Sequence, residues 1–65
     1  MSCCVNAHAL LSAVVARLAA GGETNEKELA AILGSGCTRA DMEAALSRSD
    51  AAPFLRARES LSRIP

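Results

Sequence analysis

Residues 6–20, Asn-Ala-His-Ala-Leu-Leu-Ser-Ala-Val-Val-Ala-Arg-Leu-Ala-Ala, decide the fold of this chain. The larger apolar side chains in this stretch recur at i, i+1, i+4, i+5 and i+8, which places them in a wide stripe along one face of a helix. They are Leu10, Leu11, Val14, Val15 and Leu18. Asn6 is suited to cap the start, and Gly21 followed by Gly22 favours a left-handed stop. The sequence therefore predicts a helix over residues 6–20.

This predicted helix has little polar surface on its other sides. Alanine fills much of that surface, as Ala7, Ala9, Ala13, Ala16 and Ala19. A helix that is apolar nearly all round lies either at the centre of a bundle or in an interface. A chain of 65 residues buries only about 60% of the surface that its unfolded form exposes. We therefore expect the five leucines and valines of residues 10–18 to be shared between the core and an interface with a protein partner or a second copy.

Two more helices are predicted in the middle of the chain. Asn25, followed three residues later by Glu28, has the spacing of a capping box. An apolar i, i+3, i+4 stripe comes next, before the turn predicted at Gly34-Ser35-Gly36. Thr38 then provides a second start signal, and the same stripe spacing indicates a helix to about Arg48.

The last segment, residues 53–64, is also predicted to be helical. Proline is tolerated in the first turn of a helix, and Pro53 occupies this place. On a helix Phe54, Leu55, Leu61 and Ile64 share one face. On a strand the alternation separates apolar from polar side chains poorly, so a two-stranded wing is the weaker alternative.

Composition favours helices over strands throughout the chain. Phe54 is the only aromatic residue, valine and isoleucine are sparse, and 51% of the residues are apolar. The core is therefore expected to be aliphatic and built from alanine-rich helices. We predict an all-α fold, a small bundle of three to four short helices in a single domain over residues 1–65, with residues 1–5 frayed.

Charge and cysteine content bear on the partners and the location. Seven basic and seven acidic side chains give a formal net charge of zero, whereas nucleic-acid binding normally needs a basic excess. Cys3, Cys4 and Cys37 are odd in number and two of them are adjacent, which indicates reduced thiols in a reducing compartment. The chain shows no signal-peptide pattern and no apolar run of about 20 residues. We predict a cytoplasmic protein without a membrane segment.

Catalytic and metal-binding patterns are weak. His8 is the only histidine, and nucleophilic catalysis needs a base held between a nucleophile and an orienting acid. The sequence Gly34-Ser35-Gly36 lacks the preceding strand and the following lysine of a phosphate-binding loop. Adjacent Cys3 and Cys4 do not have the spacing that wraps one zinc ion. We expect no enzyme activity, no metal, no cofactor and no small-molecule substrate.

Residues 28–46 resemble the helix-turn-helix pattern of bacterial regulators. The match rests on Leu29, Ala30, Gly34 at the corner and Thr38 at the start of the second helix. The resemblance implies that the two helices cross closely at Ala30 and that the second helix contacts DNA. The side chains that would then contact nucleic acid, or an acidic partner, are Arg39, Arg48, Arg56 and Arg58.

Asp41 and Glu43 on the second of these helices favour a protein partner over DNA, because DNA phosphates repel carboxylates. The leading interpretation is a non-enzymatic protein–protein interaction or regulatory module that acts as a homodimer or a small subunit. The alternative is a helix-turn-helix DNA-binding transcriptional regulator that reaches DNA as a dimer.

Overall fold

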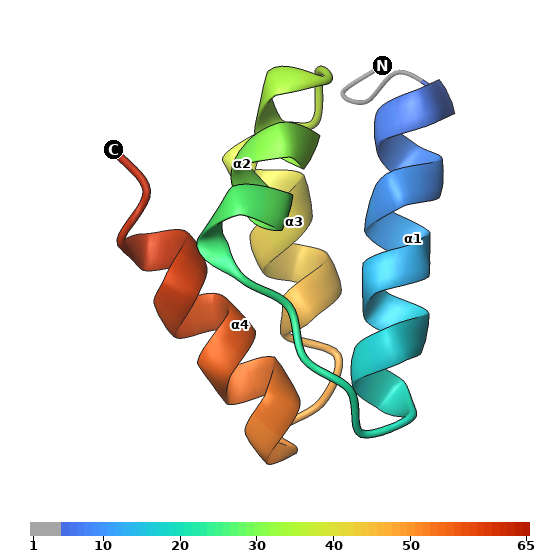
Figure 1. Cartoon of the computed structure of the whole chain (residues 1–65), viewed down its shortest axis with the longest axis vertical. Coiled ribbons are helices and arrows are strands. Elements are labelled where there is room, and N and C mark those ends of the chain that lie inside the picture. Colours follow the sequence, from blue (N-terminus) through green and yellow to red (C-terminus); the bar gives the residue numbers. More distant parts are fainter. Residues whose placement is uncertain (1–4) are drawn as a thin grey trace.

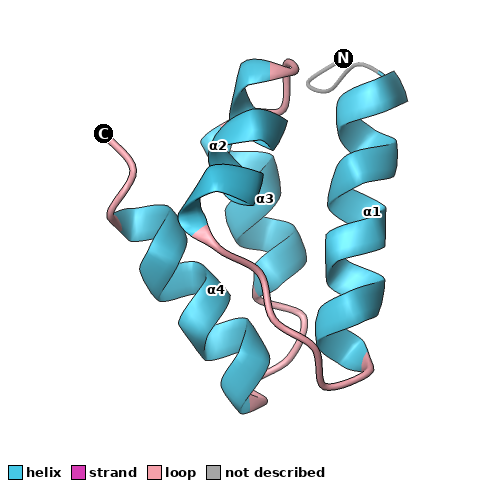
Figure 2. Cartoon of the chain, in the orientation of Figure 1, coloured by secondary structure: helices cyan, strands magenta, loops and turns pink. Residues whose placement is uncertain are grey.

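The computed structural model describes residues 5–65 and folds them into four helices. These are α1 (Val5–Ala19), α2 (Glu26–Gly34), α3 (Arg39–Leu46) and α4 (Ala52–Ser62). No strand occurs among the described residues (Figure 2). The prediction of a small all-α bundle is confirmed, and the last segment is a helix and not a wing. Within the described range, none of the helices has the length and apolarity needed to cross a membrane.

Helix α1 packs against each of the other three helices. In Figure 1 it stands along one side of the bundle, α4 lies at the opposite side, and α2 and α3 lie between them. The Cα atoms extend over 28 × 23 × 17 Å. One side of α1 therefore faces the core, and the opposite side is not covered by any described helix.

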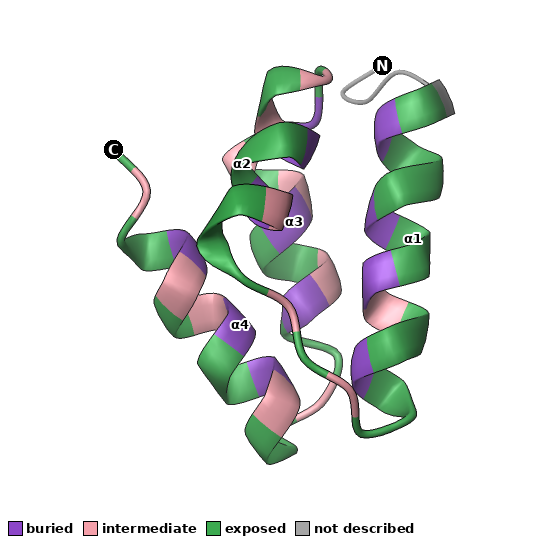
Figure 3. Cartoon of the chain, viewed as in Figure 1, coloured by how far each residue is buried: buried purple, intermediate pink, exposed green. Residues whose placement is uncertain are grey.

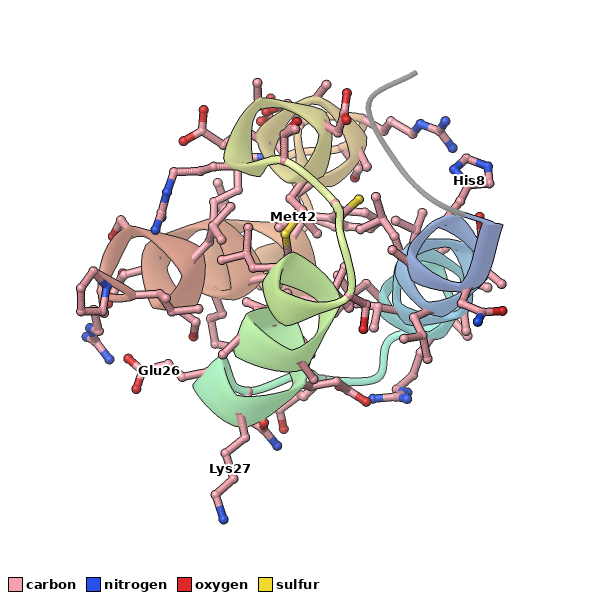
Figure 4. The ribbon with its side chains drawn as sticks, turned by 90° about the horizontal axis from the view of Figure 1, so that it is seen from above. His8, Glu26, Lys27 and Met42 are labelled. Carbon is pink, nitrogen blue, oxygen red and sulfur yellow. The ribbon has the colours of Figure 1, made fainter. Side chains whose placement is uncertain are left out.

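An aliphatic core joins all four helices (Figure 3). Its buried side chains are Ala7, Leu11, Val14, Leu18, Leu29, Ile32, Cys37, Met42, Leu46, Phe54, Ala57 and Leu61. Met42 lies at the centre of the bundle when the molecule is viewed from above (Figure 4). Its flexible thioether chain is suited to filling an irregular space between helices. The buried alanines let helix backbones approach closely, which helps a chain with a single aromatic residue to close its core.

Glycines end the first two helices. Gly21 has φ +90° and Gly36 has φ +111°, which is a region that glycine enters without steric strain. After α1, the Gly22 N–H donates to the Arg17 carbonyl oxygen at 2.9 Å, and the Gly21 N–H donates to the Leu18 carbonyl oxygen at 3.0 Å. This pair of bonds is a Schellman motif. The predicted stop at Gly21 is therefore confirmed, and the same bonding pattern closes α2 at Gly36.

Several helix boundaries differ from the prediction. Helix α1 begins at Val5, so Asn6 lies inside it and does not cap it. Fraying was expected for residues 1–5: Val5 is instead the first residue of α1, and residues 1–4 lie outside the described residues. Helix α3 ends at Leu46 and not near Arg48. The Arg58 guanidinium donates to the Leu46 carbonyl oxygen at 2.7 Å, which in a continuing helix would accept from the N–H of Asp50, four residues later.

The sequence predicted that Leu55 shares the buried face of α4, and this prediction is wrong. Its side chain is 48% exposed, whereas Phe54, Ala57 and Leu61 are buried. Positions i, i+3 and i+7 form the narrow stripe that the other helices cover. Leu55 is one residue from Phe54 and therefore lies about 100° around the helix axis.

Cys37 is buried in the turn after α2 and is disulfide-bonded. Cys3 and Cys4 lie outside the described residues. The prediction of a reduced thiol at Cys37 is therefore wrong. An odd cysteine count excludes complete pairing within one chain but not a single bond.

Candidate protein interface

The five aliphatic residues predicted for an interface divide between the core and the surface. Leu11, Val14 and Leu18 are buried. Val15 is half-buried and packs against the core. Leu10 is 46% exposed. The chain itself therefore covers three of the five residues, and Leu10 and Val15 lie at opposite edges of the covered face of α1.

The outer side of α1 consists of small, uncharged residues between these two edges. We call it the α1 outer face and define it as Ala9, Ser12, Ala13 and Ala16, all of which are exposed. Arg17 is the only charged side chain in the whole of α1. The solvent side of a helix on a globular protein normally carries several charged residues. The α1 outer face therefore lacks the usual signature of a surface that stays in water.

A groove of about 100 Å³ lies between α1 and α2, along one edge of this face. Its lining is mainly apolar and comes from Leu10, Ala13, Val14 and Arg17 on α1 and from Glu28, Ala31 and Ile32 on α2. The buried side chains of Val14 and Ile32 form its floor. A shallow apolar groove of this kind is suited to an aliphatic side chain.

An ion pair bounds this groove where α1 meets α2. Arg17 Nη1 donates to Glu28 Oε1 at 2.7 Å and to the Glu23 carbonyl oxygen at 3.2 Å, and the Thr24 hydroxyl also donates to Glu28 Oε1 at 2.5 Å. The hydrogen bonds from Arg17 and Thr24 hold the pKa of Glu28 below its ordinary value. The bond from Arg17 to Glu28 raises the pKa of Arg17. Both charges therefore persist across the neutral range and fix the side of the groove.

A second groove, of about 260 Å³, lies on the other side of α1, next to α3. It is lined by His8, Leu11, Ser12, Val15 and Ala16 from α1 and by Ala45 and Arg48 from α3 and its C-terminal loop. His8 projects away from the core (Figure 4). This groove is more polar than the first one.

Two of the four arginines predicted to contact a partner bind backbone carbonyls. Arg39 donates to the carbonyl oxygens of Leu61 at 2.8 Å and Ile64 at 2.7 Å, at the C-terminal end of α4. Arg58 donates to the carbonyl oxygens of Leu46 at 2.7 Å and Ser49 at 2.9 Å, at the C-terminal end of α3. The last carbonyls of a helix have no partner within the helix. Both guanidinium groups therefore cap helix ends.

The remaining two arginines lie apart from this arrangement. Arg48 is exposed and lines the groove beside α3. Arg56 is exposed and pairs with Glu23 at 3.4 Å. Arg39 and Arg58 bind near opposite ends of α3, so the described structure does not gather the four side chains into one basic patch.

The structure also adds residues that the sequence analysis did not assign to the interface. Ala31 and Ile32 complete the groove from α2, whereas the apolar stripe after Glu28 predicted only a helix. One signal in the sequence could have indicated that α2 lies beside this part of α1. Arg17 is the single charge on an apolar helix, and such a charge is expected to pair with an acidic residue on a neighbouring element. Residues 5–65 contain no cluster of histidine, cysteine and acidic side chains that could hold a metal ion. Cys3 and Cys4, considered above for zinc, lie outside the described residues.

Comparison with known proteins found no matching family model, no similar curated protein and no similar solved structure.

Proposed function

We propose that this chain is a non-enzymatic protein–protein interaction module that binds its partner through the α1 outer face and Leu10, as a homodimer or as a small subunit. The observation that carries the proposal is the absence of charge on the exposed side of α1 before Arg17. This side is accessible and flanked by two grooves.

The residues of this face are well suited to association. Alanine loses almost no side-chain conformational entropy on burial. Its small side chain allows two helices to approach near the lower end of the usual interaxial distance, about 8–10 Å. Leu10 is 46% exposed, and covering its apolar surface contributes roughly 25 cal/mol per Å². Contact with another helix therefore gains hydrophobic energy here and orders few side chains.

No feature of the described residues specifically favours the alternative of DNA binding through a helix-turn-helix. Arg39 and Arg58 donate to backbone carbonyls, so phosphate contacts would compete with two helix caps. Ala30, which the resemblance places at a close crossing of the two helices, is exposed. These observations favour the protein–protein interpretation over DNA binding.

The proposed location is the cytoplasm, on the sequence grounds given above. The disulfide at Cys37 is the observation that weighs against it, since stable disulfides are rare in that compartment. The interaction through α1 does not depend on the location.

Site-specific photo-crosslinking in the organism that makes the protein tests the proposed function. A photoreactive residue replaces Ala16 on the α1 outer face, and a matched variant carries it at Ala30, an exposed alanine on α2. We expect a discrete crosslinked product, with a second copy or with another polypeptide, from position 16 and not from position 30. Equal crosslinking at both positions, or none at position 16, contradicts the proposal.

A further inference from the structure

We infer that the partner of the α1 outer face is a second copy of this chain, packed with the two α1 helices antiparallel, so that Leu10 of each copy enters the α1–α2 groove of the other. This inference rests on the proposed function and names its partner.

One chain carries both complementary parts of the contact. Leu10 is a 46% exposed aliphatic side chain, and it stands at the edge of the apolar groove that Ala13, Val14, Ala31 and Ile32 also line. A two-fold symmetric dimer uses the same surface on both subunits, so a projection and a matching groove must occur together on that surface. The two copies then make the Leu10 contact twice.

The position of the charge on α1 fixes the orientation of the two helices. Arg17 lies near the C-terminal end of α1 and is the only charge on that helix. A parallel pair of α1 helices would place two Arg17 side chains together and would align the helix dipoles unfavourably. An antiparallel pair separates the arginines and sets each helix N-terminus beside the other's C-terminus. The α1 outer face also has no charge that a strongly charged partner could recognise, whereas a second copy presents an equally uncharged face.

The α1 outer face also sets the register, that is, which residues of the two α1 helices face each other. If the contact is centred between Ser12 and Ala13, antiparallel packing sets Ala9 of each copy opposite Ala16 of the other. A two-fold axis perpendicular to the plane of the two helices keeps Leu10 of both copies on the same side of the contact. Leu10 then lies against Ala13 and Arg17 of the second copy, at the mouth of its groove.

The size of the face sets the strength of the dimer. The α1 outer face runs from Ala9 to Ala16, which is about 12 Å of helix at 1.5 Å per residue, so a contact centred on it buries less than the roughly 800 Å² per partner of a standard stable interface. The dimer is therefore of the weak, reversible class. Its dissociation constant is to be measured at protein concentrations from tens of micromolar to about one millimolar.

Two exposed leucines provide a matched test of the Leu10 contact. Leu10 and Leu55 are 46% and 48% exposed, and both lie on helices. We expect sedimentation equilibrium to show that Leu10→Lys weakens dimerisation at least about tenfold, as loss of an aliphatic side chain that fills a pocket does, while Leu55→Lys leaves it within about twofold. Circular dichroism checks that both variants stay folded. A wild-type monomer at one millimolar, or equal effects of the two substitutions, overturns the inference.

A charge exchange tests the antiparallel register. Ala9→Glu and Ala16→Lys each place one charge in the contact and should weaken the dimer at least about tenfold. The double variant should recover most of the wild-type affinity, because antiparallel packing sets Glu opposite Lys twice, whereas parallel packing sets like charges together. No recovery in the double variant contradicts this register. If the purified protein is monomeric while position 16 still crosslinks to another polypeptide, the second-copy inference fails and the proposed function stands.

Discussion

Arg58 of α4 donates a hydrogen bond from Nη1 to the carbonyl oxygen of Leu46, the last residue of α3, at 2.7 Å. Arg39, the first residue of α3, donates in turn to the Leu61 carbonyl oxygen near the end of α4 at 2.8 Å. Each of these two helices thus supplies the cation that caps the other. Cations and donors at helix C-termini are favourable because the terminal carbonyls carry partial negative charge and lack partners. This exchange holds α3 and α4 antiparallel.

Arg58→Ala should destabilise the protein by about 2 kcal/mol, since it removes charge-assisted bonds to the carbonyls of Leu46 and Ser49 in a partly buried place. Urea unfolding followed by circular dichroism measures the change. The matched control is Arg56→Ala, because Arg56 is exposed and has only a 3.4 Å ion pair; it should change stability by less than about 0.5 kcal/mol. Similar losses for both variants would show that the cap at the end of α3 contributes little.

Glu28 should make stability depend on pH in the acid range. Arg17 and Thr24 hold its pKa in the folded protein below the ordinary value of 4.5. Between the folded and unfolded pKa values the unfolded chain binds more protons, so the free energy of unfolding rises with pH there. The stabilisation by Glu28 is complete above the pKa that this group has in the unfolded chain. It is lost as the pH falls through the pKa that the group has in the folded protein.

Glu28→Gln should remove this part of the pH dependence, because the amide keeps its size but does not titrate. Urea midpoints between pH 3 and pH 6 measure it, with Glu26→Gln, an exposed acid in the same helical turn, as the control. A slope unchanged by Glu28→Gln would mean that the ion pair does not persist in solution.

Asn25 should be the main stabiliser of the start of α2. Its side-chain oxygen accepts the Glu28 backbone N–H at 2.9 Å, which satisfies one of the free donors of the first turn. Asn25→Ala should cost about 1 kcal/mol in thermal or urea unfolding. Asn25→Asp retains the acceptor and should stay close to the wild type. Equal losses in the two variants would exclude the cap as the cause.

The number of free thiols tests the bond at Cys37. The chain contains three cysteines, so one disulfide within the chain leaves one thiol. Titration of the oxidised, denatured protein should give one thiol per chain before reduction and three after it. Three thiols before reduction would contradict the bond.

The helices could be predicted from the sequence because their signals are local. Gly21 ends α1 through its own backbone geometry, and Asn25 and Thr38 each cap a helix through a hydrogen bond to a residue three positions later. Such contacts depend only on spacing along the chain, which a sequence displays directly. The aliphatic core follows for the same reason, because i, i+3, i+4 spacing identifies one face of each helix.

The site could be predicted only in part because its remaining features depend on which helices become neighbours. Leu10 and Leu11 are adjacent in the apolar pattern, and only the positions of α2 and α3 decide that Leu11 is buried and Leu10 exposed. The sequence does not show that Arg39 and Arg58 cap helices, since their acceptors lie 22 and 12 residues away. Non-local pairings of this kind leave no periodic trace.

The central claim, that the α1 outer face is a contact surface for a second copy, is tested most directly by NMR spectra recorded from one millimolar to about twenty micromolar protein. We expect the concentration-dependent amide shifts to cluster on Ala9, Ala13 and Ala16 of α1 and on Ala31 of α2. The surface around Leu55 should remain unchanged. Spectra that do not change with concentration, or changes centred on α4, would contradict the account.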